Sequence, residues 1–136
     1  MTDVTDTLHV TVRHPSARVT VIAVTGDVDL HTSSTLRAHA LPVLEEQAGP
    51  HLVLDLTHVD FFDSTGLSTL IGLLHAAHGA GGSLSLASVP DRLMRMITMT
   101  GISQLLPIHA TVADALAGQP RDEPADNART GTETSA

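Results

Sequence analysis

The 136-residue sequence contains no cysteine, no tryptophan, no tyrosine and no lysine. Without cysteine, disulfide bonds and thiolate metal sites are both excluded. Its only aromatic residues are Phe61 and Phe62, so a hydrophobic core must be built almost entirely from aliphatic side chains. The length fits one domain with tails, which is enough to bury a real core.

Long apolar runs are also missing. No run reaches the roughly 18 residues of a membrane span, and the N-terminal segment MTDVTDTLHV is acidic rather than basic. We therefore expect a cytoplasmic protein with neither a membrane segment nor a signal peptide. The formal net charge is −8, of which the segment from Gln119 onward carries two units and residues 1–118 carry six. A surface of this sign repels phosphate backbones, so we expect no direct binding to nucleic acid.

Alternation and periodicity predict that strands and helices follow one another along the chain. Alternating or continuously apolar segments predict strands at 8–13, 18–25, 51–56, 83–87 and 105–108. Helical periodicity and capping residues predict helices from a cap at 32–34 to about 49, with a bend at Pro42, and at 64–79, 90–100 and 111–117.

This order indicates an α/β fold. We expect a mixed, mostly parallel sheet of about five strands, opened by a hairpin, with helices packed on it. Residues 1–118 form the predicted single domain. Residues 119–136 hold almost nothing to bury, so we predict a disordered acidic C-terminal tail.

The stretch 52–78 joins an apolar strand, a short polar turn and an amphipathic helix, and the rest of the chain is organised around it. Asp63, Ser64, Thr65 and Gly66 stand where this helix begins, with Asp60 just before them. A helix start exposes unpaired N–H groups and the positive end of the helix dipole, so it tolerates an added negative group. The spacing alone favours Ser64 and Thr65 as helix caps, with modification of a hydroxyl as the alternative.

Two motifs give the chain a family likeness. Residues 26–32 (GDVDLHT) resemble the first signature of the STAS domain. Residues 60–67 (DFFDSTGL) resemble its second signature, the loop that is phosphorylated in bacterial anti-sigma factor antagonists. Segments 81–84, 93–99 and 100–102 follow in the expected order, so the resemblance spans about residues 6–117.

The resemblance implies a binding protein rather than an enzyme. In this family a STAS domain binds an anti-sigma factor that is also a GHKL-type serine kinase, and thereby frees a sigma factor in a partner-switching stress response. The kinase phosphorylates the serine that follows Asp in the loop, which is Ser64 here, with Thr65 as the second candidate. Phosphorylation separates the partners, and a serine phosphatase restores binding.

Two alternatives stay open at this point. Stand-alone STAS domains also act as small-molecule or nucleotide sensors, or as transporter and scaffold subunits. A constitutive binder would result if Ser64 were inaccessible.

The expected partner-binding residues lie on two loops that we expect at one end of the sheet: Asp27, Asp29, Asp60, Phe62, Asp63, Ser64, Thr65 and Gly66. Gly66 lacks a Cβ and is expected to let a partner's backbone approach. One phenylalanine of the adjacent pair is expected in the core and the other at the surface. We expect no cofactor and no metal, because His75 and His78 have no third ligand in view.

Overall fold

The computed structural model describes residues 8–46 and 48–119, and the predicted tail from 120 onward lies outside the described residues. The strands are β1 (Leu8–Ser16), β2 (Val19–Val28), β3 (His51–Phe62), β4 (Ser83–Ala87) and β5 (Ile108–His109). The helices are α1 (Ser33–Glu46), α2 (Ser64–Gly79), α3 (Asp91–Met99) and α4 (Val112–Ala117), with a 3-10 turn, η1 (Ile102–Gln104), after α3.

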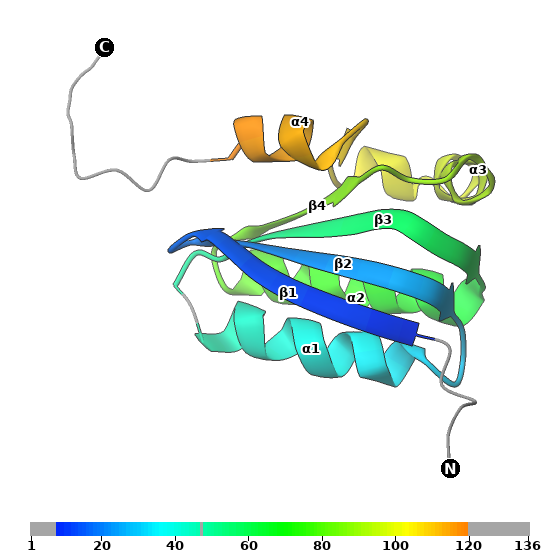
Figure 1. Ribbon diagram of the computed structural model, residues 1–136, viewed down its shortest axis with the longest axis horizontal. Helices are drawn as coiled ribbons and strands as arrows, with labels where there is room; N and C mark the ends of the chain where they lie inside the picture. The colour runs from blue at the N-terminus through cyan, green and yellow to red at the C-terminus, as the bar shows by residue number, and fades with distance from the viewer. Residues whose placement is uncertain (1–7, 47, 120–136) are drawn as a thin grey trace.

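The five strands form one sheet in the order of the sequence, β1-β2-β3-β4-β5. β1 is antiparallel to β2, and the other three pairings are parallel. The α1 and α2 helices cover one face of the sheet, α4 lies over the other, and α3 lies near the end of β3 (Figure 1). The structure therefore confirms the predicted mixed, mostly parallel α/β architecture.

The core is aliphatic, as the composition requires. Its main part lies between the sheet and helices α1 and α2, and includes the fully buried Ile22, Leu36, Leu54 and Leu73. A smaller cluster lies on the opposite face, where Ala115 of α4 packs with the side chains of Val21, Val53 and Ala87. Neighbouring residues of β2 and β3 are thus buried on opposite faces, which explains their continuously apolar sequences.

The third strand is longer than its local sequence indicates. We expected a polar turn after Leu56, but β3 continues to Phe62 and leads directly into the Asp63 position before α2. β3 carries one extra residue at each of two bulges relative to β2: one lies between Asp55 and His58, and the second is Asp60. Polar residues that resemble a turn therefore occupy exposed positions of a bulged strand. β2 likewise continues beyond its predicted end to Val28.

The helices agree more closely with their predicted positions. α2 and β4 have the predicted bounds, and α1 continues through Pro42, which is exposed on the helix. Leu36, Ala40 and Leu44 form the buried side of α1 on both sides of that proline. Among the described residues, no helix combines the length and the apolarity that crossing a bilayer requires.

Candidate functional site

The loops after β2 and β3 lie side by side at the carboxyl ends of these two strands (Figure 1). The last pair of the β2–β3 register is Val28 with Phe62. The next residue, Asp63, donates its backbone N–H to the carbonyl oxygen of Val28 over 3.2 Å. The expectation that both loops share one end of the sheet is therefore confirmed.

Asp63 is the residue that caps α2. Its backbone is extended, with φ −109° and ψ −171°, and its carboxylate accepts the Gly66 N–H at 3.0 Å. Its carbonyl oxygen accepts the Leu67 N–H, also at 3.0 Å. The expectation from spacing that Ser64 and Thr65 cap the helix is therefore wrong, because the preceding carboxylate takes that role.

Ser64 is the first residue of α2, and its side chain is exposed. Within residues 8–46 and 48–119, its hydroxyl makes no hydrogen bond. Thr65 is less accessible, and its carbonyl oxygen accepts the hydroxyl of the buried Thr69 at 3.0 Å. Thr69 in turn lies 3.5 Å from a guanidinium nitrogen of Arg37 on α1. Of the two hydroxyls, that of Ser64 is the better placed for an enzyme to reach.

Gly66 and Phe62 are packed against each other inside the protein. A Cβ at Gly66 would lie 2.6 Å from the Phe62 ring and 3.0 Å from the carbonyl oxygen of Val28. Our expectation that Gly66 admits a partner's backbone is corrected: the missing side chain makes room for an internal ring. Phe62 is only 5% exposed, which also corrects its expected role as a surface contact. The ring at the surface is that of Phe61, which is 46% exposed.

The first loop is held rigid by a hydrogen-bond network between Asp29 and Thr32. The Asp29 carboxylate accepts the N–H groups of His31 and Thr32 at 2.9 and 3.1 Å. The buried Thr32 hydroxyl donates to the carbonyl oxygen of Asp27 at 2.6 Å and accepts the Asp29 N–H at 3.0 Å. Sequence reasoning considered Thr32 only as one possible cap. The Asp three residues before a Thr at a helix start is the signal that could have revealed this network.

The network also controls the charge of Asp29. Burial acts to raise the pKa of this carboxyl, but it is outweighed by the hydrogen bonds from Thr32 and His31 and by the nearby His31 charge. The pKa of Asp29 is consequently lower than usual, and the carboxylate stays ionised at neutral pH.

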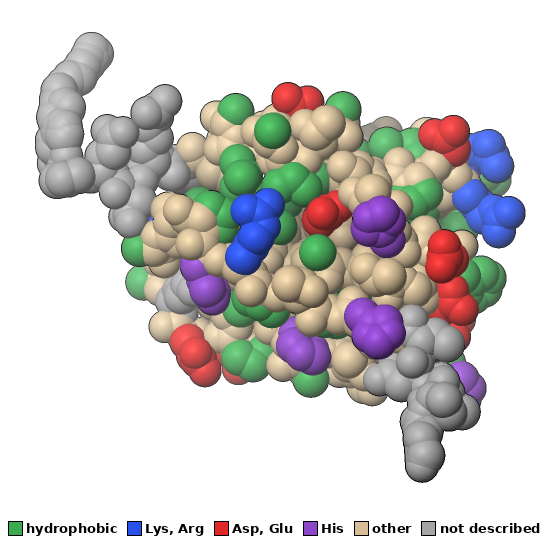
Figure 2. All heavy atoms as spheres, in the orientation of Figure 1, with side chains coloured by type: hydrophobic (Ala, Val, Ile, Leu, Met, Phe, Trp, Pro, Cys, Tyr) green, Lys and Arg blue, Asp and Glu red, His purple; other side chains and the backbone are tan. Residues whose placement is uncertain are grey.

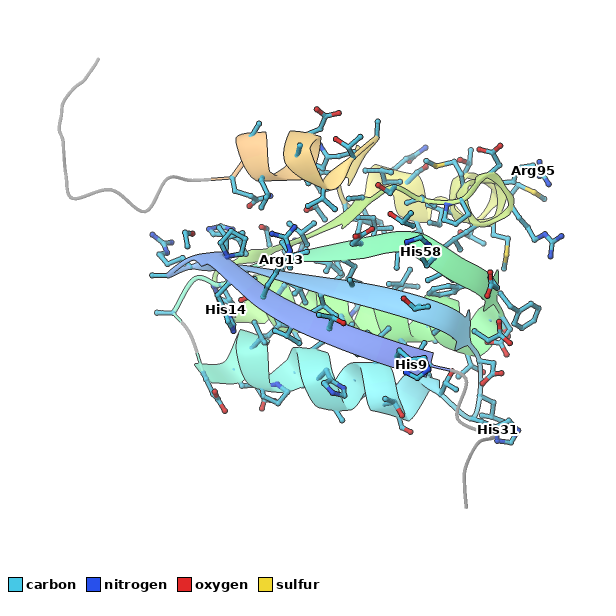
Figure 3. The ribbon with its side chains drawn as sticks, in the orientation of Figure 1. His9, Arg13, His14, His31, His58 and Arg95 are labelled. Atoms are coloured by element: carbon cyan, nitrogen blue, oxygen red, sulfur yellow. The ribbon has the colours of Figure 1, made fainter. Side chains whose placement is uncertain are left out.

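Four carboxylates belong to the same end of the sheet as Ser64. Asp60 is exposed, while Asp27, Asp29 and Asp63 are half-buried. Figure 2 shows acidic side chains at the end of the molecule where β3 finishes, with arginine side chains next to them. Arg95 of α3, labelled in Figure 3, is one of these arginines. The site is therefore an acidic surface bordered by the basic side of α3.

The hollow beside this surface is small. It lies between the end of β3 and α3, has a volume of about 20 Å³ and is lined by residues that include Phe61, Pro90, Arg92 and Met96. This space holds about one water molecule, so no nucleotide fits there. In the part of the chain that the structure describes, no group of three or more potential ligand side chains is arranged to hold a metal ion.

A family model described as the STAS domain matches residues 10–115. The chain therefore belongs to the STAS-domain family, and the resemblance found in its two loop motifs is confirmed.

Several similar proteins carry a more specific name. The anti-sigma F factor antagonist of Paenibacillus polymyxa is 28% identical over 98 residues, which cover 72% of this chain and 84% of that protein. The anti-sigma-B factor antagonist of Bacillus subtilis is 32% identical over 89 residues, covering 65% and 80%. The crystal structure of an anti-sigma factor antagonist from Mycobacterium paratuberculosis aligns with a TM-score of 0.74 at 27% identity, covering 85% of this chain and 97% of that one.

Proposed function

We propose that this protein is an anti-sigma factor antagonist that acts by partner switching in the cytoplasm. In its unmodified form it binds an anti-sigma factor that is also a GHKL-type serine kinase, and a sigma factor is released. Phosphorylation of Ser64 by that kinase separates the two proteins, and a serine phosphatase restores binding. The names of the similar proteins support the class of function. The observation that carries the switch is the exposed Ser64 hydroxyl at the start of α2, which has no hydrogen-bond partner among the described residues.

The geometry of α2 supports modification of Ser64 without unfolding. Asp63 already satisfies the N–H groups of Gly66 and Leu67. The N–H groups of Ser64 and Thr65 remain as donors at the helix start, which favours a negative group there. The fold should therefore accept a phosphate at this position.

The surrounding charges explain why a phosphate would release a partner. A phosphoserine adds about −1.5 to −2 charges at neutral pH. It would arrive next to Asp63, at the end of the sheet that also carries Asp27, Asp29 and Asp60, on the surface that a partner must cover. Each loss of about 1.4 kcal/mol weakens binding tenfold, so a few such losses are enough to separate two proteins. This mechanism requires no rearrangement of the fold.

The test is to incubate the purified full chain with ATP and each anti-sigma factor kinase encoded in the same genome. We expect a mass gain of one phosphate that peptide mapping places on Ser64. Ser64→Ala should abolish this gain, whereas Thr65→Val and Ser68→Ala, which change neighbouring α2 hydroxyls, should retain it. Phosphate on Thr65, or on no residue, would contradict the assignment.

A matched pair of variants then tests the charge. Ser64→Asp and Ser64→Asn introduce side chains of the same size, but only aspartate carries a charge. We expect Ser64→Asp to weaken binding to the kinase by tenfold or more relative to Ser64→Asn, with both variants melting at about the wild-type temperature. Equal binding by the two variants would exclude an electrostatic switch.

A further inference from the structure

Two exposed apolar side chains lie at the same end of the sheet as Ser64. The large hydrophobic residues with substantial exposure in the described chain are Val12, Leu30, Phe61, Met99 and Leu105. Of these, Leu30 is 68% exposed and belongs to the loop that follows β2. Phe61 is 46% exposed, and in the sheet register it lies beside Asp27 of β2.

Both side chains are presented by rigid parts of the fold. Leu30 lies between Asp29 and Thr32, whose hydrogen bonds fix the first loop. Phe61 owes its position to the bulge at Asp60, which places two consecutive residues, Asp60 and Phe61, at the surface of β3. A backbone segment that is already held in place loses little conformational freedom when a partner covers it, so a side chain that it carries contributes more to affinity than one on a mobile segment.

We infer that Leu30 and Phe61 are the apolar anchors with which this surface holds its partner, and that the partner is a protein face with an apolar depression rimmed by lysine or arginine. This inference rests on the proposed function and names the contacts of the same site. A single exposed apolar residue needs no explanation. Two of them at the same end of the sheet, Leu30 on the loop after β2 and Phe61 at the end of β3, together with four carboxylates and an accessible serine, match a binding surface with an apolar centre and a charged rim.

The charge of the surface determines the chemistry of the partner's rim. Asp27 is the penultimate residue of β2, Asp29 and Asp63 lie just after β2 and β3, and Asp60 directly precedes Phe61. Opposite charges on the partner are needed to balance these carboxylates on contact. Arg92 of α3 lines the same small hollow as Phe61, so we expect the partner to carry negative charge opposite that part of α3.

The test measures the affinity of the full chain for each purified anti-sigma factor kinase of the same genome, in the presence of ADP. Leu30→Ser and Phe61→Ser should each weaken binding by about tenfold or more, as is typical of central interface residues. Val12→Ser is the matched control, because Val12 is also an exposed apolar residue, 36% accessible, but it pairs with Ile22, well before the loops. It should leave the affinity within about twofold of wild type.

The rim is tested by kinetics. Asp60→Asn removes one charge and retains the shape of the side chain, so it should slow association more than it speeds dissociation. Because salt screens exposed charges, the difference from wild type should diminish as salt is raised from about 0.05 to 0.5 M. An unchanged association rate at low salt would exclude a basic rim opposite Asp60.

The outcomes separate this inference from the function on which it rests. Suppose that Ser64→Asp weakens binding but Leu30→Ser and Phe61→Ser bind like wild type. The assignment of Leu30 and Phe61 as anchors is then wrong, while the proposed switch at Ser64 is retained. If wild type binds none of the kinases, both the proposed function and the anchor assignment are rejected. Thermal melting of each variant checks folding. If Phe61→Ser unfolds, Leu30→Ser still decides between the outcomes, because it changes an exposed loop side chain outside the core.

Discussion

At the scale of single residues, Asp63 joins the two loops of the site and starts α2. Its N–H bonds to the end of β2 through Val28, and its carboxylate bonds to the N–H of Gly66. The position of Ser64 therefore depends on a neighbour that performs no chemistry itself.

Replacing Asp63 by alanine should lower the free energy of unfolding by about 1 kcal/mol, because the N–H of Gly66 loses its cap. Asp63→Asn should retain most of the stability, since an asparagine side chain also caps helices well. Urea denaturation monitored by circular dichroism provides the measurement. Asp60→Ala is the control, because Asp60 is exposed and plays no capping role. Equal losses in Asp63→Ala and Asp60→Ala would show that the cap contributes nothing.

Sequence reasoning reached the right stretch at this scale and misjudged individual roles within it. Asp63, Ser64 and Thr65 are all residue types that cap helices, and spacing alone does not determine which of three neighbours takes the position. Likewise, Phe61 and Phe62 have the same side chain. Only the bulge at Asp60 decides that Phe62 turns inward and Phe61 outward.

At the scale of elements, α2 is fitted to the end of β3 through Gly66. The helix also contains Gly72, where an added Cβ would meet nothing within 4 Å. The two glycines thus occupy one helix in opposite environments, one against the Phe62 ring and one facing open space.

Alanine substitutions at these two glycines should have effects of opposite sign. Gly66→Ala forces its Cβ against Phe62 and the β2 carbonyl oxygen, and should destabilise the protein by about 1 to 3 kcal/mol. Gly72→Ala should stabilise it by up to about 1 kcal/mol, because alanine is the better helix former. Thermal and urea denaturation of both variants will measure the effects. A neutral Gly66→Ala would show that Phe62 can move aside freely.

The elements that could be predicted are those whose signals are local. α2 begins after a capping residue and ends at a glycine-rich turn, and β4 shows strict alternation, so both bounds followed from the sequence. The extension of β3 to Phe62 depends instead on pairing with β2 through two register shifts. No local pattern contains that information, because the partner strand lies more than 30 residues away in the chain.

At the scale of the whole molecule, the two ends of the sheet have different roles. The candidate site occupies the end where β2 and β3 finish. At the opposite end, His51 begins β3, donates its N–H to the carbonyl oxygen of Arg18 at 2.9 Å, and places Nδ1 2.8 Å from the Ser83 hydroxyl. Its Nε2 is buried without a hydrogen-bond partner in the described structure. Burial, and then the positive charge of Arg18, lower the pKa of His51 below its usual value of 6.5.

This arrangement should make the fold sensitive to mild acid. Because the pKa of His51 is lower in the folded state, the unfolded state binds more protons below pH 6.5. The stabilisation from a neutral His51 is therefore fully present above about pH 6.5, and is lost progressively as the pH falls toward the folded-state pKa. Urea denaturation between about pH 7.5 and 5 should show a falling free energy of unfolding.

A pair of histidine variants tests whether His51 causes this decline in the free energy of unfolding. His51→Asn should flatten the decline of stability below pH 6.5, whereas His9→Asn, which changes an exposed residue of β1 (Figure 3), should leave it in place. Asp29 does not contribute to the decline measured between about pH 7.5 and 5. Its pKa is lowered from the ordinary value of 3.8, so its titration affects stability only in stronger acid. An identical pH profile in His51→Asn and wild type would exclude His51 as the source.

The bulge at Asp60 makes the end of β3 a place where chains of this fold can differ in length by one residue. Val59 pairs with Gly26 and Phe61 pairs with Asp27, so a chain without residue 60 would continue the ladder with unbroken alternation and the same core. In an alignment, a one-residue gap here would therefore be compatible with an unchanged fold. Such a deletion would remove the carboxylate beside Phe61 and leave a less acidic surface at the end of β3.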